Sequence, residues 1–422
     1  VMDKVTRLTA EQEAVRNLST DGRYVVTGPP GTGKSLLAVL RAARIMAQSK
    51  PVIVLSKNVP LNSHLKESIA PSLQDIESLK TFDSDSGKSI RTYDSWSSSL
   101  WRRVPSAAGK EYRDRRGPML ATDPDWGYDW ITAADDVLER HEPENARRML
   151  EIPDNVIVDE GQDLPAPFFE FLMRMGCNVT VFADENQRIY TGMSTIEGIK
   201  SALKITKDGG SVFEVRKNFR NTRQVAEVAA VFYVGLPTGI PELPDRLGPK
   251  SAAVEFEDLS SLASAIVGLA QRKRGTKVGS GPSVGVVVLQ GKRRMRELQS
   301  VLEQIADGLD IRLYEKEAFK ERPFKFDEAE SVTLVTPWTM KGLEWDNVVV
   351  VVDGFKLDET PEKLLTQKMQ AYVAASRPRS QLLLAWTRTR RKGTNSGPPE
   401  LLQPLLDGPQ SEKVAREWNN AR

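Results

Sequence analysis

The 422-residue sequence predicts an α/β fold with two parallel-sheet domains in tandem. Short, β-branched apolar runs alternate with helix-like segments, a pattern typical of strands that are buried on both faces of a parallel sheet. A glycine-rich segment joins the first strand to a helix, and a second series of strands follows in the C-terminal half. A chain of this length has room for two or three domains.

The first domain is expected over residues 1–212. A helix is expected near its start, over residues 10–19, and the alternation of apolar and polar segments then predicts a four-stranded core. The apolar runs that predict these strands occupy residues 23–27, 51–55, 156–158 and 179–182.

Residues 83–150 interrupt this rhythm and are expected to form a small inserted subdomain. Trp96 and Trp101 are followed there by a group of basic residues: Arg102, Arg103, Lys110, Arg113, Arg115 and Arg116. Basic residues interleaved with aromatic ones can hold a nucleic-acid backbone and stack its bases. The same composition also fits a solvated charged face above buried tryptophans, and the sequence leaves both interpretations open.

The second domain is expected over residues 213–390, with a separate C-terminal tail over 391–422. The tail is basic and then rich in proline and glycine, which favours partial disorder. The second sheet is predicted from apolar runs at 284–289, 332–335, 348–352 and 381–386, with helices at 292–306 and 362–376.

Composition narrows the function classes. The net charge of +2 neither demands nor excludes a nucleic-acid partner. Cys177 is the only cysteine, so no intrachain disulfide can form, and a reducing, cytoplasmic location is expected. With only His64 and His141 besides, a zinc site built from cysteine and histidine is excluded. No apolar run approaches the length of a membrane span, so no membrane partner is expected.

Residues 28–35 (GPPGTGKS) fit the phosphate-binding loop pattern G-x-x-x-x-G-K-[ST], between an apolar strand and a helix. The backbone N–H groups of such a loop and the positive end of the helix attract a polyphosphate. Lys34 is expected to reach the β- and γ-phosphates, and the Ser35 hydroxyl to ligate Mg²⁺. The sequence therefore predicts a nucleoside triphosphate site formed by Gly28, Pro29, Pro30, Gly31, Thr32, Gly33, Lys34 and Ser35.

Acidic residues follow the strand at 156–158. Asp159 can hold Mg²⁺ opposite Ser35, and Glu160 beside it can orient and deprotonate the attacking water. Gln187 lies in a polar segment after the next strand, where it could sense the γ-phosphate. The chemistry of the residues alone allows this role for Gln187 without requiring it.

From about Leu8 to Trp386, the ordered series of motifs resembles the superfamily-1 helicases of the UvrD/Rep type. The resemblance implies two RecA-like motor domains with an ATP and Mg²⁺ site in the cleft between them. Residues 8–12 (LTAEQ) resemble the leading glutamine motif of the family, in which Gln12 would read adenine. Residues 184–190 (DENQRIY) resemble the motif that couples γ-phosphate sensing, here through Gln187, to the DNA strand.

Three further motifs of the resemblance lie in the second domain. In residues 218–221 (NFRN), Phe219 would stack on the base and Arg220 would meet the phosphates. Residues 341–345 (KGLEW) contain Gly342 and Glu344, and the glutamate would contact the ribose.

The last motif, residues 372–377 (YVAASR), would supply Arg377 as an arginine finger. Hydrolysis spreads negative charge over the γ-phosphate oxygens, and such an arginine contributes roughly 10³–10⁵ in rate. A nucleotide bound by both domains would draw them together, and hydrolysis would release them.

The resemblance also implies strand contacts. They involve Ser56 and Asn58 after the second strand, Thr92 and Tyr93 in a segment similar to the family's Thr-Phe-His-Ser, and Tyr190 and Trp338. The chain departs from the family at Asp94 and Trp338, which replace histidines, and at Gly192, which replaces a stacking tryptophan. These departures bear on the grip on the strand and leave the ATP chemistry intact.

The expected function is that of an ATP-dependent DNA helicase or single-stranded DNA translocase. Larger members of the family carry a long insertion before the motif that corresponds to residues 341–345. Here only about residues 315–331 lie between a strand and this motif, so such a large accessory subdomain is expected to be absent. Such a compact motor would depend on a protein partner for unwinding or nuclease function. Two alternatives stay open: an RNA helicase of the same superfamily, and a nucleotide-driven switch subunit of a DNA repair or anti-phage defence complex.

Overall fold

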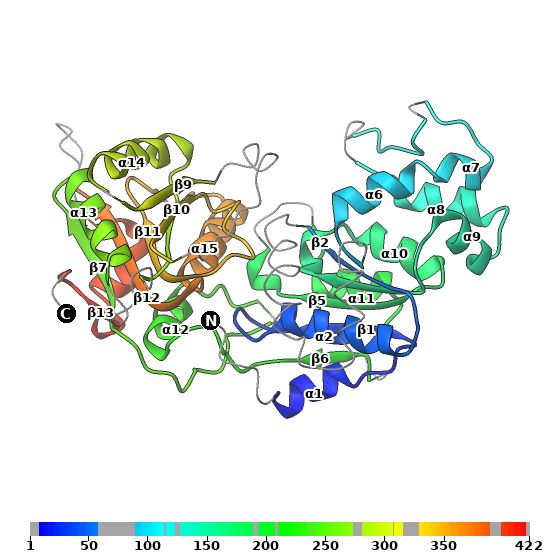
Figure 1. The fold of residues 1–422 in the computed structure, drawn as a ribbon, viewed down its shortest axis with the longest axis horizontal. Coiled ribbons are helices and arrows are strands. Elements are labelled where there is room, and N and C mark those ends of the chain that lie inside the picture. The colour runs from blue at the N-terminus through cyan, green and yellow to red at the C-terminus, as the bar shows by residue number, and fades with distance from the viewer. Residues whose placement is uncertain are drawn as a thin grey trace. The chain divides into compact units, whose positions relative to one another are not determined.

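The computed structural model describes residues 8–57, 89–113, 115–122, 127–188, 193–206, 210–236, 238–272, 281–306, 308–314, 329–388 and 398–418. The chain divides into two compact units. Val1–Pro29 and Gly33–Val215 form the first, and Pro30–Thr32 and Arg216–Arg422 form the second. Each unit contains one sheet with helices around it, and the named strands of both sheets pair in parallel (Figure 1). The predicted α/β fold with two parallel-sheet domains is confirmed.

The first sheet has the strand order β3-β2-β4-β5-β1-β6. Its strands are β1 (Arg23–Thr27), β2 (Val52–Ser56), β3 (Ile90–Thr92), β4 (Asn155–Asp159), β5 (Asn178–Ala183) and β6 (Val212–Glu214). Because β5 pairs with both β4 and β1, the segments that follow these three strands meet at one edge of the sheet. Ligands of open α/β sheets bind at this carboxyl edge.

Both faces of the first sheet are buried. Val156 and Val158 of β4 belong to one hydrophobic core, whereas Ile157 between them belongs to the other. The second of these cores is built on the long helix α2 (Lys34–Ala47), and α1 (Ala10–Arg16) contributes Val15 to it. The first core is covered by α6 (Tyr93–Trp101), α7 (Val104–Ala108), α8 (Trp130–Leu138), α9 (Pro143–Leu150), α10 (Ala166–Arg174) and α11 (Ile196–Ala202).

Helices α6–α9 lie within residues 83–150, where an inserted subdomain was predicted, and gather at one end of the first unit (Figure 1). The strand β3 of the same range belongs to the first sheet. Trp96, Trp101 and Trp130 are at most 3% exposed, and the Trp101 and Trp130 rings stack with centroids 4.8 Å apart. The predicted basic residues lie on the outside: Arg102, Lys110, Arg113, Arg115 and Arg116 are exposed, and Arg103 is half-buried. The tryptophans therefore form a core beneath a solvated charged face, which is the second of the two interpretations that the sequence left open.

The second sheet has the order β13-β7-β12-β11-β8-β10-β9. Its strands are β7 (Ser251–Phe256), β8 (Val284–Val288), β9 (Asp310–Leu313), β10 (Ser331–Val335), β11 (Trp345–Val351), β12 (Pro378–Thr387) and β13 (Val414–Ala415). The helices of this unit are α12 (Arg223–Ala229), α13 (Leu259–Ala270), α14 (Lys292–Ile305), α15 (Pro361–Ala375) and α16 (Gln403–Leu406). Helices α13 and α14 pack on one face of the sheet, where Leu262, Ile266 and Leu298 are fully buried.

The structure differs from the prediction of a separate C-terminal tail. β13 pairs with β7 at the edge of the second sheet, with Val414 opposite Ser251. Leu402 and Leu405 of the same region are fully buried, so residues 398–418 belong to the second unit. Among the described residues, no helix is both long and apolar enough to cross a membrane.

Candidate functional site

The loop between β1 and α2 has the backbone that its sequence pattern requires. Gly31 and Gly33 adopt φ values of 82° and 84°, in the left-handed region that glycine enters without steric cost. A Cβ atom on Gly33 would lie 3.1 Å from the Gln12 amide nitrogen, and one on Gly31 would lie 2.5 Å from the Asn218 side-chain oxygen. Glycine is thus needed at both positions for conformation and for space.

Lys34 starts α2 and directs its amine back into this loop. The side chain is buried, and Nζ donates to the carbonyl oxygens of Gly28 at 2.5 Å and Pro29 at 3.0 Å. The ammonium group therefore lies inside the turn, next to the positive end of a 14-residue helix. A phosphate chain is bound by features of this kind: a fixed ammonium group, glycines with a left-handed backbone, and the N-terminus of a helix.

Asp159 ends β4 as a fully buried carboxylate. Its Oδ1 accepts from the Glu160 backbone N–H at 3.1 Å, and its Oδ2 has no hydrogen-bond partner in the described part of the chain. Burial and, next, the nearby Glu160 charge raise the pKa of Asp159 to about 7, although the adjacent Ser35 side chain and the Lys34 charge lower it. A buried carboxylate oxygen without a partner, beside a serine hydroxyl, suits a bound divalent cation.

No group of three or more histidine, cysteine, aspartate or glutamate side chains in the described ranges could hold a metal by itself. Mg²⁺ commonly needs only one or two protein ligands, because waters and substrate phosphates complete its octahedral shell. Ser35 and Asp159 therefore fit an ion that is bound together with a phosphate chain.

Glu160 and Gln187 lie in one buried hydrogen-bonded group at the same edge. Glu160 begins the turn η3 (Gly161–Asp163), and Gln187 ends the turn η4 (Glu185–Gln187) after β5. The Gln187 amide nitrogen donates to Asp184 Oδ2 at 2.6 Å. Gln162 connects this aspartate to Glu160, and the sequence interpretation gave this glutamine no role.

Gln12 lies beside the loop, as an adenine reader would. It forms a capping box with Thr9 at the start of α1, in which the Gln12 amide oxygen accepts from the Thr9 N–H at 3.1 Å. Its amide nitrogen faces Gly33. In the first unit, the structure thus brings Gln12, Gly33 and Lys34 of the phosphate loop, Asp159, Glu160 and Gln187 to one edge of the sheet.

A second cluster of predicted residues lies in the second unit and is centred on Glu344. The Glu344 carboxylate accepts from Arg220 Nε at 2.7 Å and from Arg379 Nη2 at 2.8 Å. Arg246 donates to the backbone carbonyl oxygens of both of these arginines. Arg220 Nη1 is buried and has no hydrogen-bond partner among the described residues, so the cluster keeps a donor for an anion. Arg246 and Arg379 were missed from the sequence, although Arg379 is only two residues from Arg377.

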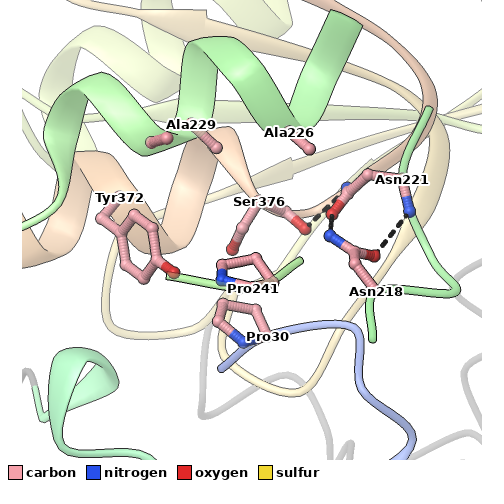
Figure 2. Close-up of a pocket in the computed structure, with 9 residues that line it drawn as sticks. Pro30, Asn218, Asn221, Ala226, Ala229, Pro241, Tyr372 and Ser376 are labelled. Atoms are coloured by element: carbon pink, nitrogen blue, oxygen red, sulfur yellow. Dashed lines mark hydrogen bonds between the residues drawn. The ribbon is translucent and has the colours of Figure 1, made fainter. Parts of the chain in front are cut away.

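The 218–221 segment is fixed to the end of α15. Asn221 donates through Nδ2 to the Ser376 carbonyl oxygen at 3.2 Å and accepts from Asn218 at 2.8 Å (Figure 2). Its Nδ2 also donates to the Pro378 carbonyl oxygen at 2.5 Å. These residues line a small pocket together with Tyr372 and Pro30 (Figure 2). Its volume of about 10 Å³ is room for one water molecule, so it is not a nucleotide pocket.

Arg377, Phe219 and Gly342 occupy three different environments in the second unit. Arg377 follows α15 and is 1% exposed, and its Nε donates to the Val373 carbonyl oxygen of that helix at 3.0 Å. Phe219 is 48% exposed. Gly342 adopts a left-handed φ of 78° two residues before Glu344.

Tyr93, one of the predicted strand contacts, lies in the core of the first unit. Tyr93 is buried, its ring packs edge-on against Phe168 at 5.0 Å, and its hydroxyl accepts from Trp130 Nε1 at 3.0 Å. Contacts of Tyr93 with residues of α8 and α10 place the ring in the core, so its side chain is not exposed for the strand contact that the resemblance implied.

The other predicted strand contacts differ in exposure. Ser56 is fully buried at the end of β2, whereas Trp338 is 47% exposed. Thr92 caps α6 by accepting from the Ser95 N–H at 3.2 Å. Asn58 and Tyr190 lie outside the described residues, as does Gly192.

A comparison with known protein families finds a match. A family model described as Schlafen group 3, DNA/RNA helicase domain, matches residues 22–381, a range that includes residues 28–35 and Glu344. A comparison with curated proteins finds no match.

Proposed function

The chain belongs to the Schlafen group 3 DNA/RNA helicase domain family, and from this premise we propose that it is a motor that couples Mg-ATP hydrolysis to movement along single-stranded DNA. A helicase-type family supports a nucleotide-hydrolysing enzyme in general. That the nucleotide is ATP, that the metal is Mg²⁺ and that the strand is DNA goes beyond what the family supports, and these three points are our proposal.

One observation carries the nucleotide part of the proposal. The buried Asp159 carboxylate keeps an oxygen without a partner beside Ser35, at the edge where Lys34 is held inside the loop. Burying a carboxylate away from compensating charge is costly. A divalent cation at this place would remove that cost.

The residues of the first unit divide the chemistry among them. Lys34 and the loop amides bind the phosphates, and Ser35 and Asp159 hold Mg²⁺, which when bound neutralises phosphate charge. Glu160 accepts the proton of the attacking water, and Gln187 orients that water. Gln12 hydrogen-bonds the adenine edge.

In the second unit, Arg220 and Arg377 receive the negative charge that develops on the γ-phosphate. Phe219 stacks on the adenine, and Glu344 is the expected ribose contact. Since Glu344 already holds two arginines in this structure, we propose that it acts mainly by orienting them.

RNA is the second candidate strand, because the matching family description names both DNA and RNA. The two nucleic acids differ by the 2′-hydroxyl group, which a discriminating protein must contact. Competition between DNA and RNA oligomers of matched sequence, measured by fluorescence anisotropy, distinguishes them. Tighter binding of the RNA oligomer would replace DNA in the proposal.

Steady-state ATP hydrolysis with Mg²⁺, with and without single-stranded DNA, tests the proposal. Lys34→Ala is the blank, because it removes the phosphate-binding amine. We expect turnover that the strand stimulates and that the Lys34 variant lacks. Lys34-dependent turnover that ignores both DNA and RNA would instead indicate a nucleotide-driven switch that acts on a protein partner.

A further inference from the structure

Gln162 is a fully buried amide at the carboxyl edge of the first sheet, and the proposed function gives it no role. Its Nε2 donates to Glu160 Oε2 at 2.5 Å, and its Oε1 accepts from the Asp184 backbone N–H at 3.0 Å. The side chain thus bridges the turn after β4 to the turn after β5.

The chemistry of the two partners fixes the orientation of this amide. The Asp184 N–H can only donate, so it must face the amide oxygen of Gln162. The NH₂ group of Gln162 then faces Glu160, where a carboxylate can only accept. A glutamine is the neutral side chain of this length that offers an acceptor to one partner and a donor to the other.

Glu160 lies in an unusual and tightly packed turn. Its backbone has a φ of 56°, a left-handed conformation that residues other than glycine rarely adopt. Gly161, which follows, has no room for a side chain, because a Cβ atom there would lie 2.2 Å from Val181 Cγ1. The turn is therefore held tightly against β5, while the rotatable Glu160 side chain is oriented by Gln162.

The bridge continues to the predicted γ-phosphate sensor. Asp184 accepts from the Asn186 N–H through Oδ1 at 3.1 Å and from Gln187 Nε2 through Oδ2 at 2.6 Å. Glu160, Gln162, Asp184 and Gln187 thus form one continuous chain of hydrogen bonds in which every side chain is at most 8% exposed.

We infer that Gln162 is a positioning residue for hydrolysis: it holds the Glu160 carboxylate in the orientation that accepts the proton of water, and it links that orientation to the Asp184–Gln187 turn. The inference rests on the proposed ATP hydrolysis. A purely structural glutamine would lower stability when removed but would leave turnover of the folded protein unchanged.

Two variants test this role with opposite chemistry. Gln162→Leu removes both hydrogen bonds at similar volume. Gln162→Glu keeps an acceptor for the Asp184 N–H but places a carboxylate against Glu160. Asn155→Leu is the matched control. Asn155 is a buried amide at the start of β4, the strand that precedes Gln162, and its Nδ2 donates to the Pro51 carbonyl oxygen at 3.2 Å.

For both Gln162 variants we expect kcat to fall about 10²-fold, because a misplaced catalytic group costs about that much. The KM for ATP should change by less than about twofold, since the nucleotide contacts remain. Asn155→Leu should keep the wild-type kcat. In a Glu160→Gln background, adding Gln162→Leu should cost nothing more, because Gln162 acts through Glu160.

Each outcome decides between this inference and its premise. Wild-type kcat in Gln162→Glu, or an undiminished effect of Gln162→Leu in the Glu160→Gln background, would overturn the role of Gln162 and leave the proposed function standing. A wild-type protein without Lys34-dependent turnover would overturn both together.

Discussion

The carboxyl edge of the first sheet and the helical insertion α6–α9 bury opposite kinds of residue. At the edge, Asp159, Gln162 and Asp184 are completely buried polar side chains. In the insertion, Trp96, Trp101 and Trp130 are buried, and most of the predicted basic residues are exposed. Both regions have compositions that suggest function, but of the two, within the described residues, only the edge buries carboxylates, which are costly to bury.

This difference predicts opposite consequences of substitution. Polar groups buried at an active edge contribute to chemistry, and their conservative replacement should change turnover more than stability. Buried aromatic rings contribute large apolar areas to the core, and their truncation should change stability more than turnover. The predictions below test this contrast, beginning with the largest expected effect.

Glu160→Gln should lower kcat by about 10²–10⁴, because the amide cannot accept the proton of water. ATP affinity and melting temperature should stay close to those of the wild type, since size and shape are kept. Single-turnover kinetics and nucleotide binding by calorimetry measure the two effects separately. Normal turnover in this variant would remove Glu160 from the assignment as the general base.

Trp130→Ala should lower the free energy of unfolding by about 3–5 kcal/mol, as is typical of a large ring removed from a core. Trp130 is 1% exposed and packs against Trp101 at 4.8 Å and Phe168 at 5.0 Å. Below the melting temperature, kcat per folded molecule should be unchanged.

Trp338→Ala is the control for this substitution, because its side chain is 47% exposed and its truncation should leave the free energy of unfolding nearly unchanged. Urea denaturation of both variants, followed by circular dichroism, gives the comparison. A Trp130 variant that is as stable as the Trp338 variant would show that the insertion has no packed core.

Glu344→Gln extends the contrast to the second unit. The change keeps the shape but removes the charge that holds Arg220 and Arg379, whose side chains are each 20% exposed. A hydrogen bond to a charged group contributes about 1.5–3 kcal/mol, so we expect a loss in kcat/KM of about tenfold or somewhat more. A loss confined to ADP or ATP affinity, with kcat unchanged, would favour the simple ribose contact.

The smallest effect is expected on the exposed face of the insertion. Replacing Arg102 and Arg113 together by alanine should change the free energy of unfolding by less than about 0.5 kcal/mol per site. Affinity for a labelled DNA oligomer, measured at two salt concentrations, should stay at the wild-type value. A weaker salt dependence in the variant would instead assign phosphate contacts to this face.

The sequence was sufficient for the features that depend on local order. Apolar runs between helices predicted both sheets, and the glycine pattern predicted a loop whose left-handed backbone at Gly31 and Gly33 the structure contains. These signals are local, because a buried strand requires apolar residues and a left-handed backbone favours glycine at the positions themselves.

The features that the sequence missed depend on partners far along the chain. Gln162 forms a hydrogen bond with Asp184, and Arg379 forms one with Glu344, only because the fold brings separate segments together. The hydrogen bond of Gln162 with Glu160 completes the first of these contacts. Tyr93 matched a strand-contacting segment, yet its environment is set by α8 and α10. β13 has two residues, which is too short for any periodicity to show.

The most direct test of the nucleotide site is a crystal structure with Mn²⁺ and a non-hydrolysable ATP analogue, in which anomalous scattering locates the ion. The account predicts a single strong anomalous peak next to the Ser35 hydroxyl and the Asp159 carboxylate, bound directly or through water, with the phosphates in the Lys34 loop. An ion or a phosphate chain bound elsewhere, with the Asp159 carboxylate unchanged, would contradict it.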